Sequence, residues 1–62
     1  MAYVFDFITS DGVIDHFHVG AFDDDTAALT QAEAALLETA VAASVEVWRG
    51  MDRVARFQAH PR

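Results

Sequence analysis

The absence of cysteine is the feature that most limits how this chain can fold, because the chain has only 62 residues. A chain of this length buries only about 60% of its unfolded surface, and the usual additions to its stability are disulfides, a metal ion or self-association. Without cysteine, disulfides and thiolate metal sites are excluded. The chain has to form one hydrophobic core, and we expect association with a second copy to stabilise it.

The overall composition predicts a folded domain outside the membrane. Hydrophobic residues make up 53% of the chain, charged residues make up 23%, and there is a single proline. The apolar runs are far shorter than the roughly 20 residues that span a bilayer, and no basic and apolar export signal precedes the first predicted strand. We expect no membrane partner and a cytoplasmic location.

The charges divide the chain into an acidic part and a basic part. Residues 1–48 contain nine acids and neither Lys nor Arg, whereas residues 49–62 contain four Arg and one Asp, and the net charge is -6. A nucleic-acid-binding surface needs clustered basic residues, so we expect no nucleic acid partner. We expect the basic C-terminal part to lie against acidic neighbours in the fold.

The first twenty residues have the pattern of a β-hairpin. Residues 2–9 alternate with the period of a strand, and Ser10-Asp11-Gly12 can close a three-residue loop if Gly12 takes the left-handed conformation. With Thr9 opposite Val13, apolar residues pair with each other and an acid pairs with an imidazole: Phe5 with Phe17, Tyr3 with Val19 and Asp6 with His16.

A second register is possible for this hairpin. A two-residue Asp11-Gly12 turn would pair Phe5 with His18 and Asp6 with Phe17. Because a slip of one residue inverts the faces of a strand, only one of the two registers can match the apolar face. The first register is the one we predict.

A helix is predicted from residue 23 to residue 42. Asp23 or Asp24 is the natural N-cap, which is a better reading of the three aspartates than a calcium loop, because the alternating acids and the central Gly of such a loop are missing. At 100° per residue the helix presents an apolar stripe that should cover the face of Phe5, Phe7 and Phe17: Leu29, Ala32, Leu36 and Ala40. Small residues also repeat at coiled-coil spacing, which leaves open a helix-to-helix contact: Ala28, Ala32, Ala35, Thr39 and Ala42.

The C-terminal third has the pattern of a second hairpin. Residues 44–48 alternate, the chain turns through Gly50, and residues 53–58 return. A loop closed at Arg49 and Arg53 gives favourable cross-strand pairs: Val47 with Ala55, Val45 with Phe57 and Glu46 with Arg56. A tighter Gly50-Met51 turn is the alternative, and residues 59–62 are predicted as a tail.

These elements predict an α+β fold of the order ββαββ, with one helix packed on one face of a four-stranded antiparallel sheet. The whole chain forms one domain, with a hairpin at 2–20, a helix at 23–42, a hairpin at 44–58 and a tail at 59–62. Its opening Tyr3-Val4-Phe5-Asp6, its Ala-rich helix and its closing segment 45–50 resemble a family of short, uncharacterised ββαββ proteins common in alphaproteobacteria. That resemblance implies a fold and no activity.

A second resemblance concerns the middle of the chain. Residues 22–37 are similar to the start of the helix in antitoxins of the HicB type, although the Pro-Asp-Leu-Pro-Gly segment of that family is missing here.

The residue types that support catalysis are sparse. Ser10 and Ser44 lack a Gly-flanked nucleophile motif, and the three glycines are isolated, so no phosphate-binding loop is present. We expect neither an enzyme nor a bound cofactor. His16 and His18 lie two residues apart on one strand, so they are the candidate metal ligands together with Asp6 or His60, but they form an incomplete shell for a structural metal.

The face of the sheet that the helix leaves uncovered is the candidate interface. An apolar patch with a polar rim, containing Trp and Arg, is typical of a protein-binding surface. Its predicted members are Trp48, Val4, Ile8, Ile14, Val54, His16, His18 and Arg56, with Asp6 and Glu46 among them. We therefore expect a small interaction module that forms a homodimer, and the alternative is an acidic nucleic-acid mimic or antitoxin-like inhibitor that binds a basic site on another protein.

Overall fold

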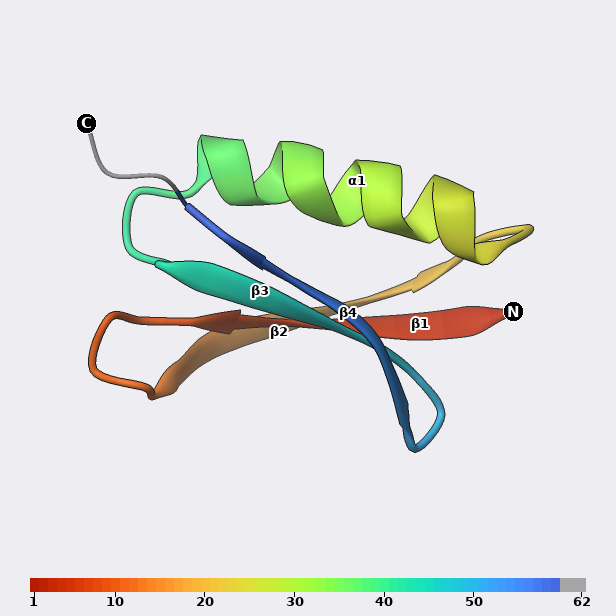
Figure 1. Ribbon diagram of the computed structural model, residues 1–62, viewed down its shortest axis with the longest axis horizontal. Helices are drawn as coiled ribbons and strands as arrows, with labels where there is room; N and C mark the ends of the chain where they lie inside the picture. The colour runs from red at the N-terminus through yellow and green to blue at the C-terminus, as the bar shows by residue number, and fades with distance from the viewer. Residues whose placement is uncertain (60–62) are drawn as a thin grey trace.

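A computed structural model describes residues 1–59 of the chain. It contains four strands and one helix: β1 (Ala2–Ile8), β2 (Ile14–Ala21), α1 (Asp25–Glu38), β3 (Ser44–Arg49) and β4 (Asp52–Gln58). The strands form one antiparallel sheet in the order β2-β1-β3-β4, and α1 lies across one face of it (Figure 1). The predicted α+β fold is confirmed.

The core lies between α1 and the two central strands. Alternate residues of β1 and β3 point towards the helix and are buried: Tyr3, Phe5, Phe7, Val45 and Val47. The helix contributes Ala28, Ala32 and Leu36, whose mostly small side chains let it lie close to the aromatic rings. The helix-to-helix contact that the small residues left open is not available to Ala28 and Ala32, because both face the sheet.

The helix begins as predicted and ends earlier than predicted. Asp24 is the N-cap, and its carboxylate accepts a hydrogen bond of 2.9 Å from the backbone N–H of Ala27. The helix ends at Glu38, four residues before the predicted end. Ala43 N–H donates to the carbonyl of Ile8 at 2.8 Å, so residues 39–43 have to leave the helix to join β3 to β1.

The first hairpin has the predicted loop but not the predicted register. Thr9 N–H donates to the carbonyl of Val13 at 2.8 Å, and Gly12 has a φ of 86°, as the three-residue loop requires. Beyond this loop Ile8 pairs with Ile14, but Phe7 pairs with His16, so Asp15 forms a β-bulge. The bulge shifts the rest of β2 by one residue and turns His16 and His18 towards the helix side.

The second hairpin has the predicted register but not the predicted loop. Val45 pairs with Phe57, and Glu46 pairs with Arg56. Arg49 pairs with Asp52, however, so the turn is the tighter Gly50-Met51 turn, with Gly50 at a φ of 62°. A bulge at Val54 takes up the extra residue and restores the predicted pairs.

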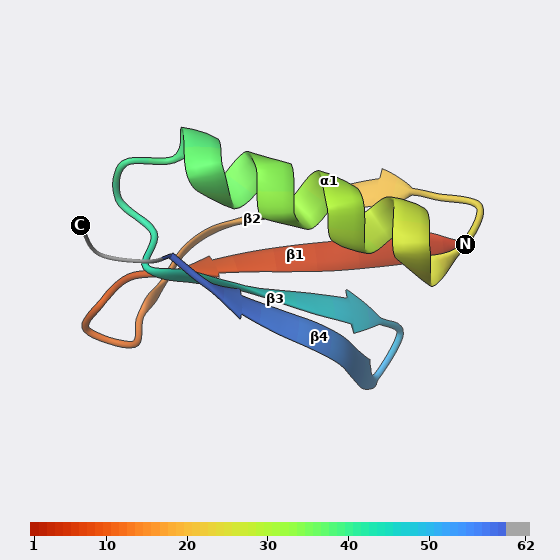
Figure 2. The same cartoon turned by 45° about the horizontal axis from the view of Figure 1, so that its top comes forward.

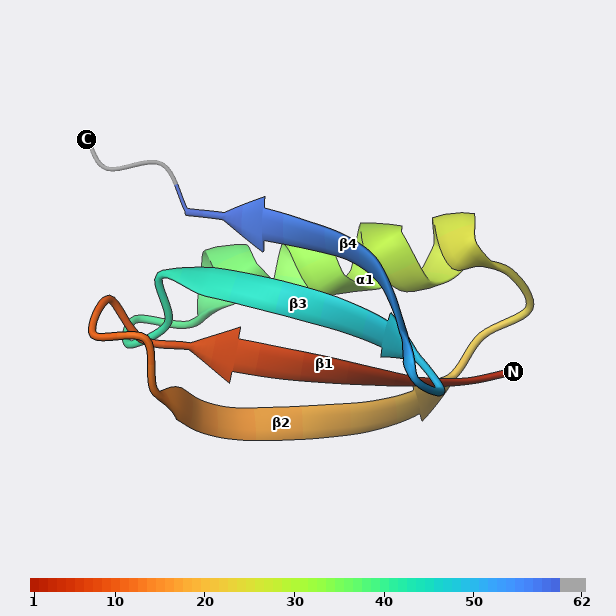
Figure 3. The same cartoon turned by 60° about the horizontal axis from the view of Figure 1, so that its bottom comes forward.

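The helix does not cover the whole sheet. Its main contacts are with β3, β4 and β1, and β2 lies at the edge of the sheet beyond it (Figures 2 and 3). Within residues 1–59 no helix has the length and apolar character that crossing a membrane requires. Because α1 leaves β2 uncovered, the side chains of β2 are exposed almost throughout.

Candidate functional site

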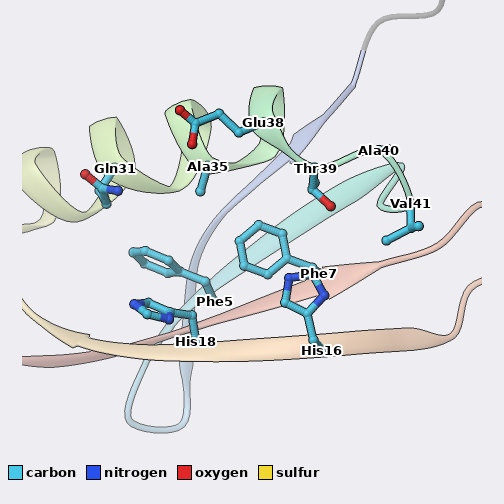
Figure 4. A pocket seen from close by; sticks show the side chains of 10 residues that line it. All are labelled: Phe5, Phe7, His16, His18, Gln31, Ala35, Glu38, Thr39, Ala40 and Val41. Carbon is cyan, nitrogen blue, oxygen red and sulfur yellow. The ribbon is translucent and has the colours of Figure 1, made fainter.

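A groove of about 510 Å³ lies between α1 and β2. Phe5 and Phe7 of β1 form its floor, the two histidines of β2 form one wall, and α1 with the segment after it forms the other (Figure 4). The groove exists because α1 sits over β1, β3 and β4 and leaves the helix side of β2 open. The residues of the helix wall are Gln31, Ala35, Glu38, Thr39, Ala40 and Val41.

Each histidine of the groove lies against a phenylalanine of β1. The rings of Phe7 and His16 are stacked, with centroids 4.6 Å apart and planes 9° apart, and His18 is tilted over Phe5 at 6.4 Å. The Nδ1 atom of His16 is 2.7 Å from a carboxylate oxygen of Asp15, the residue at the bulge. The predicted pairing of His16 with Asp6 is wrong, because the bulge turns His16 away from the face on which Asp6 lies.

The groove has few of the parts that chemistry at a histidine requires. An imidazole oriented by a carboxylate is one component of a catalytic base, but it acts on a nucleophile or a substrate within hydrogen-bond reach. Among residues 1–59 no hydroxyl group donates a hydrogen bond to either imidazole. Both members of the His16–Asp15 pair are also more than 40% exposed, so water reaches them freely.

The predicted metal ligands do not come together. His16 and His18 face the groove, whereas Asp6 lies on the opposite face of the sheet, and His60 lies outside the described residues. In the described part of the chain no three His, Cys, Asp or Glu side chains are grouped as a metal site would require.

The opposite face of the sheet, which no helix covers, holds the predicted centre of the interface. Val4, Ile8 and Trp48 lie on this face and are partly exposed. The bulge adds Phe17 and Val19, which are 66% and 56% exposed and were not predicted here. The exposed apolar surface is therefore centred on β2 and not on Trp48.

The remaining predicted interface residues divide between several places. Ile14 pairs with Ile8 and is 54% exposed, and Arg56 pairs with Glu46 on the uncovered face. His16 and His18 lie in the groove, and Val54 packs against the core at its bulge, so these three are not on the uncovered face as predicted.

Two arginines of the C-terminal hairpin pair with acidic neighbours, as the charge pattern predicted, one within the hairpin and one on the helix. Arg53 donates to Glu46 at 3.1 Å on the uncovered face. At the start of the helix, Nη1 of Arg49 donates to both oxygens of Asp25 at 2.7 and 2.8 Å, and the hydroxyl of Tyr3 donates to the same carboxylate at 2.5 Å. These bonds tie β1, α1 and β3 together at one end of the domain.

The contacts of Asp25 change the proton affinity of the groups involved. The hydrogen bond from Tyr3, followed by that from Arg49, holds the pKa of the Asp25 carboxyl below its usual value. The hydrogen bond to Asp25 is the main reason that the pKa of the Tyr3 hydroxyl is raised, and the same carboxylate raises the pKa of Arg49. The sequence placed Arg49 only in a turn, so this cluster could not have been predicted from it.

Trp48 carries a buried polar atom on the uncovered face. Within residues 1–59 its indole Nε1 has no hydrogen-bond partner, although the atom is shielded from solvent. An unsatisfied buried donor costs about 1–3 kcal/mol.

Comparison with known protein families, with curated proteins and with solved structures finds no match for this chain.

Proposed function

We propose that this protein is a small, non-enzymatic interaction module that acts as a homodimer. The observation that carries the proposal is the exposure of Phe17 and Val19, two large apolar side chains adjacent on one face of an edge strand. Together with Ile14 on the same strand and Val4 on its neighbour, they form an apolar patch of the kind that marks a protein interface.

The size of the chain supports self-association as the use of this patch. The core contains nine buried hydrophobic residues, three of them alanines. A core of this size leaves little stability in reserve, and a partner that binds only the folded form adds to it by mass action. Complete burial of an aromatic side chain removes about 150–250 Å² from water, and 66% of Phe17 is still exposed for a partner to cover.

The acidic-mimic alternative is weakened because four of the ten carboxylates have partners within the chain. Asp24 caps the helix, Asp25 binds Arg49, and Glu46 binds Arg53. Asp15 is paired with His16 at the far end of β2. A mimic needs its carboxylates free and gathered on one surface, and these are neither.

The test is the oligomeric state of the wild type and of Phe17→Arg by sedimentation velocity at tens of micromolar. We expect a wild-type dimer and a loss of affinity of at least tenfold in the variant, because the substitution places a charge in the apolar patch. Leu37→Arg is the matched control, since Leu37 is 82% exposed on the helix, away from the patch. It should remain dimeric. A monomeric wild type, or equal effects of the two variants, would contradict the proposal.

A further inference from the structure

Every second residue of β2 directs its backbone N–H and C=O groups to β1, and the residues between them direct theirs to the free edge of the sheet. Phe22 N–H donates to the carbonyl of Met1 at 3.0 Å, and the Met1 amino group donates to the carbonyl of Phe22 at 2.9 Å. In an antiparallel ladder every second residue makes such bonds, so His18 and Gly20 also direct their backbone groups towards β1. The N–H and C=O groups of Phe17, Val19 and Ala21 therefore point away from β1, in the plane of the sheet, towards its free edge.

The two edges of the sheet differ in how they are protected. Natural edge strands avoid unwanted pairing through charged side chains, proline and bulges. β4 has such protection, because it carries Asp52, Arg53 and Arg56 and has a bulge at Val54 within it. β2 has its bulge at one end, and residues 16–21 contain no Asp, Glu, Lys, Arg or Pro. The edge of β2 is thus the one that is left open for another strand.

We propose that β2 pairs antiparallel with β2 of a second copy, about a two-fold axis that passes through His18 perpendicular to the sheet. This inference rests on the proposed homodimer and assigns its interface. The pairing joins the two four-stranded sheets into one continuous sheet, with both helices on the same side. The grooves of the two copies then meet along the paired β2 strands, with both pairs of histidines between them.

The position of the axis follows from the symmetry and from the exposed side chains. A two-fold axis perpendicular to the sheet keeps each residue on its own face, and paired residues have to share a face. The axis therefore lies midway between the two copies of one residue, which pair with each other. With His18 on the axis, Phe17 lies opposite Val19 of the second copy twice, so the two exposed apolar residues of β2 become cross-strand neighbours on one face. An axis at Val19 would leave Phe17 opposite the small Ala21, and an axis at Phe17 would set Val19 opposite Asp15.

A cysteine scan tests the pairing directly, because the natural chain has no cysteine. On the axis the two copies of residue 18 form a pair without backbone hydrogen bonds, with Cα atoms about 4.5 Å apart, which a disulfide can bridge. We expect His18→Cys to cross-link most of the protein under mild oxidation. His16→Cys is the matched control on the same face, since its two copies would be about 13 Å apart along the strands.

Phe17→Cys and Val19→Cys complete the scan, because each would cross-link most strongly if the two-fold axis lay at that residue and not at His18. Cross-linking strongest at residue 16, 17 or 19 would overturn the assigned register. Absence of cross-linking at all four positions in a dimeric protein would overturn the pairing and leave the proposed homodimer intact. A monomeric wild type would overturn both, so the two failures are distinguishable.

A second pair of variants separates edge pairing from packing through the uncovered face. Val19→Pro removes an N–H that points away from β1, so it should leave the hairpin folded and raise the dimer dissociation constant at least tenfold. Val19→Ala removes most of the side chain but keeps the N–H, and it should have a smaller effect. Trp48→Arg should leave the dimer intact. Monomers from Trp48→Arg with unchanged association of Val19→Pro, both folded by circular dichroism, would place the interface on the uncovered face instead.

Discussion

The carboxylate of Asp25 joins three elements, because it connects α1 to both β1 and β3. It belongs to the first turn of α1 and receives hydrogen bonds from Tyr3 of β1 and Arg49 of β3. A negative charge near a helix N-terminus is also favoured by the helix dipole. Its ionised form is therefore stabilised by the folded state in more than one way.

The lowered pKa of Asp25 predicts how stability depends on acid pH. Because the folded-state pKa lies below the usual value of 3.8, the stabilisation is fully present above about pH 4 and is lost as the pH falls through the folded-state value. Asp25→Asn should be less stable than wild type at pH 7 and should lose less stability between pH 4 and pH 2. Urea unfolding at several pH values measures both effects.

Asp23→Asn provides the control for this prediction. Asp23 is exposed and belongs to the same run of aspartates, but it makes none of the contacts of Asp25. It should follow the wild-type pH dependence. If both variants flatten the curve equally, the effect comes from net charge and not from the Asp25 contacts.

At the scale of the elements, the distance between α1 and the sheet is set by small side chains. Ala28 and Ala32 are fully buried against the aromatic residues of β1. Ala32→Leu should push the helix away from the sheet and lower the free energy of unfolding by about 1–3 kcal/mol, as overpacking does. Ala34→Leu, at an exposed position of the same helix, should change it by less than about 0.5 kcal/mol. Thermal or urea unfolding distinguishes the two, and equal effects would contradict this account of the core.

The existence of every element could be predicted from local pattern, whereas the exact pairing could not. Alternation in residues 2–8 and the helix-forming run after Asp24 are local signals, and both elements are present. The bulge at Asp15 is not local, because its benefit comes from partners on other strands: Phe7 stacks on His16, and Gly20 leaves room for the ring of Phe22 against Phe5. The early end of α1 likewise depends on the bond between Ala43 and Ile8.

The candidate site was only partly predictable for the same reason. The uncovered face and its residues Val4, Ile8 and Trp48 follow from the period of a strand and from having a single helix. Because Asp15 is unpaired, Phe17 and Val19 lie on the uncovered face where the two histidines were predicted, and the histidines lie on the helix side. The groove was not predicted, since it depends on how far α1 lies from the edge of the sheet.

For the whole molecule, the distribution of charge bears on what it can bind. Two of the three arginines within residues 1–59 are engaged with acids of the same chain, Arg49 with Asp25 and Arg53 with Glu46. With a net charge of -6, the protein should not bind labelled duplex DNA or RNA at physiological salt. Fluorescence anisotropy measures this, and micromolar binding that weakens steeply with salt would contradict it.

The bulge at Asp15 also affects how sequences of different length could share this fold. Ile8 pairs with Ile14, and Phe7 pairs with His16, so a chain that lacked residue 15 could keep both pairs in an uninterrupted ladder. A one-residue deletion at this point would leave every side chain of β2 on its present face. A deletion within residues 16–19 that kept the bulge would instead move the residues after it to the opposite face. In the evolution of this hairpin, the position of a gap would therefore matter more than the identity of the residue removed.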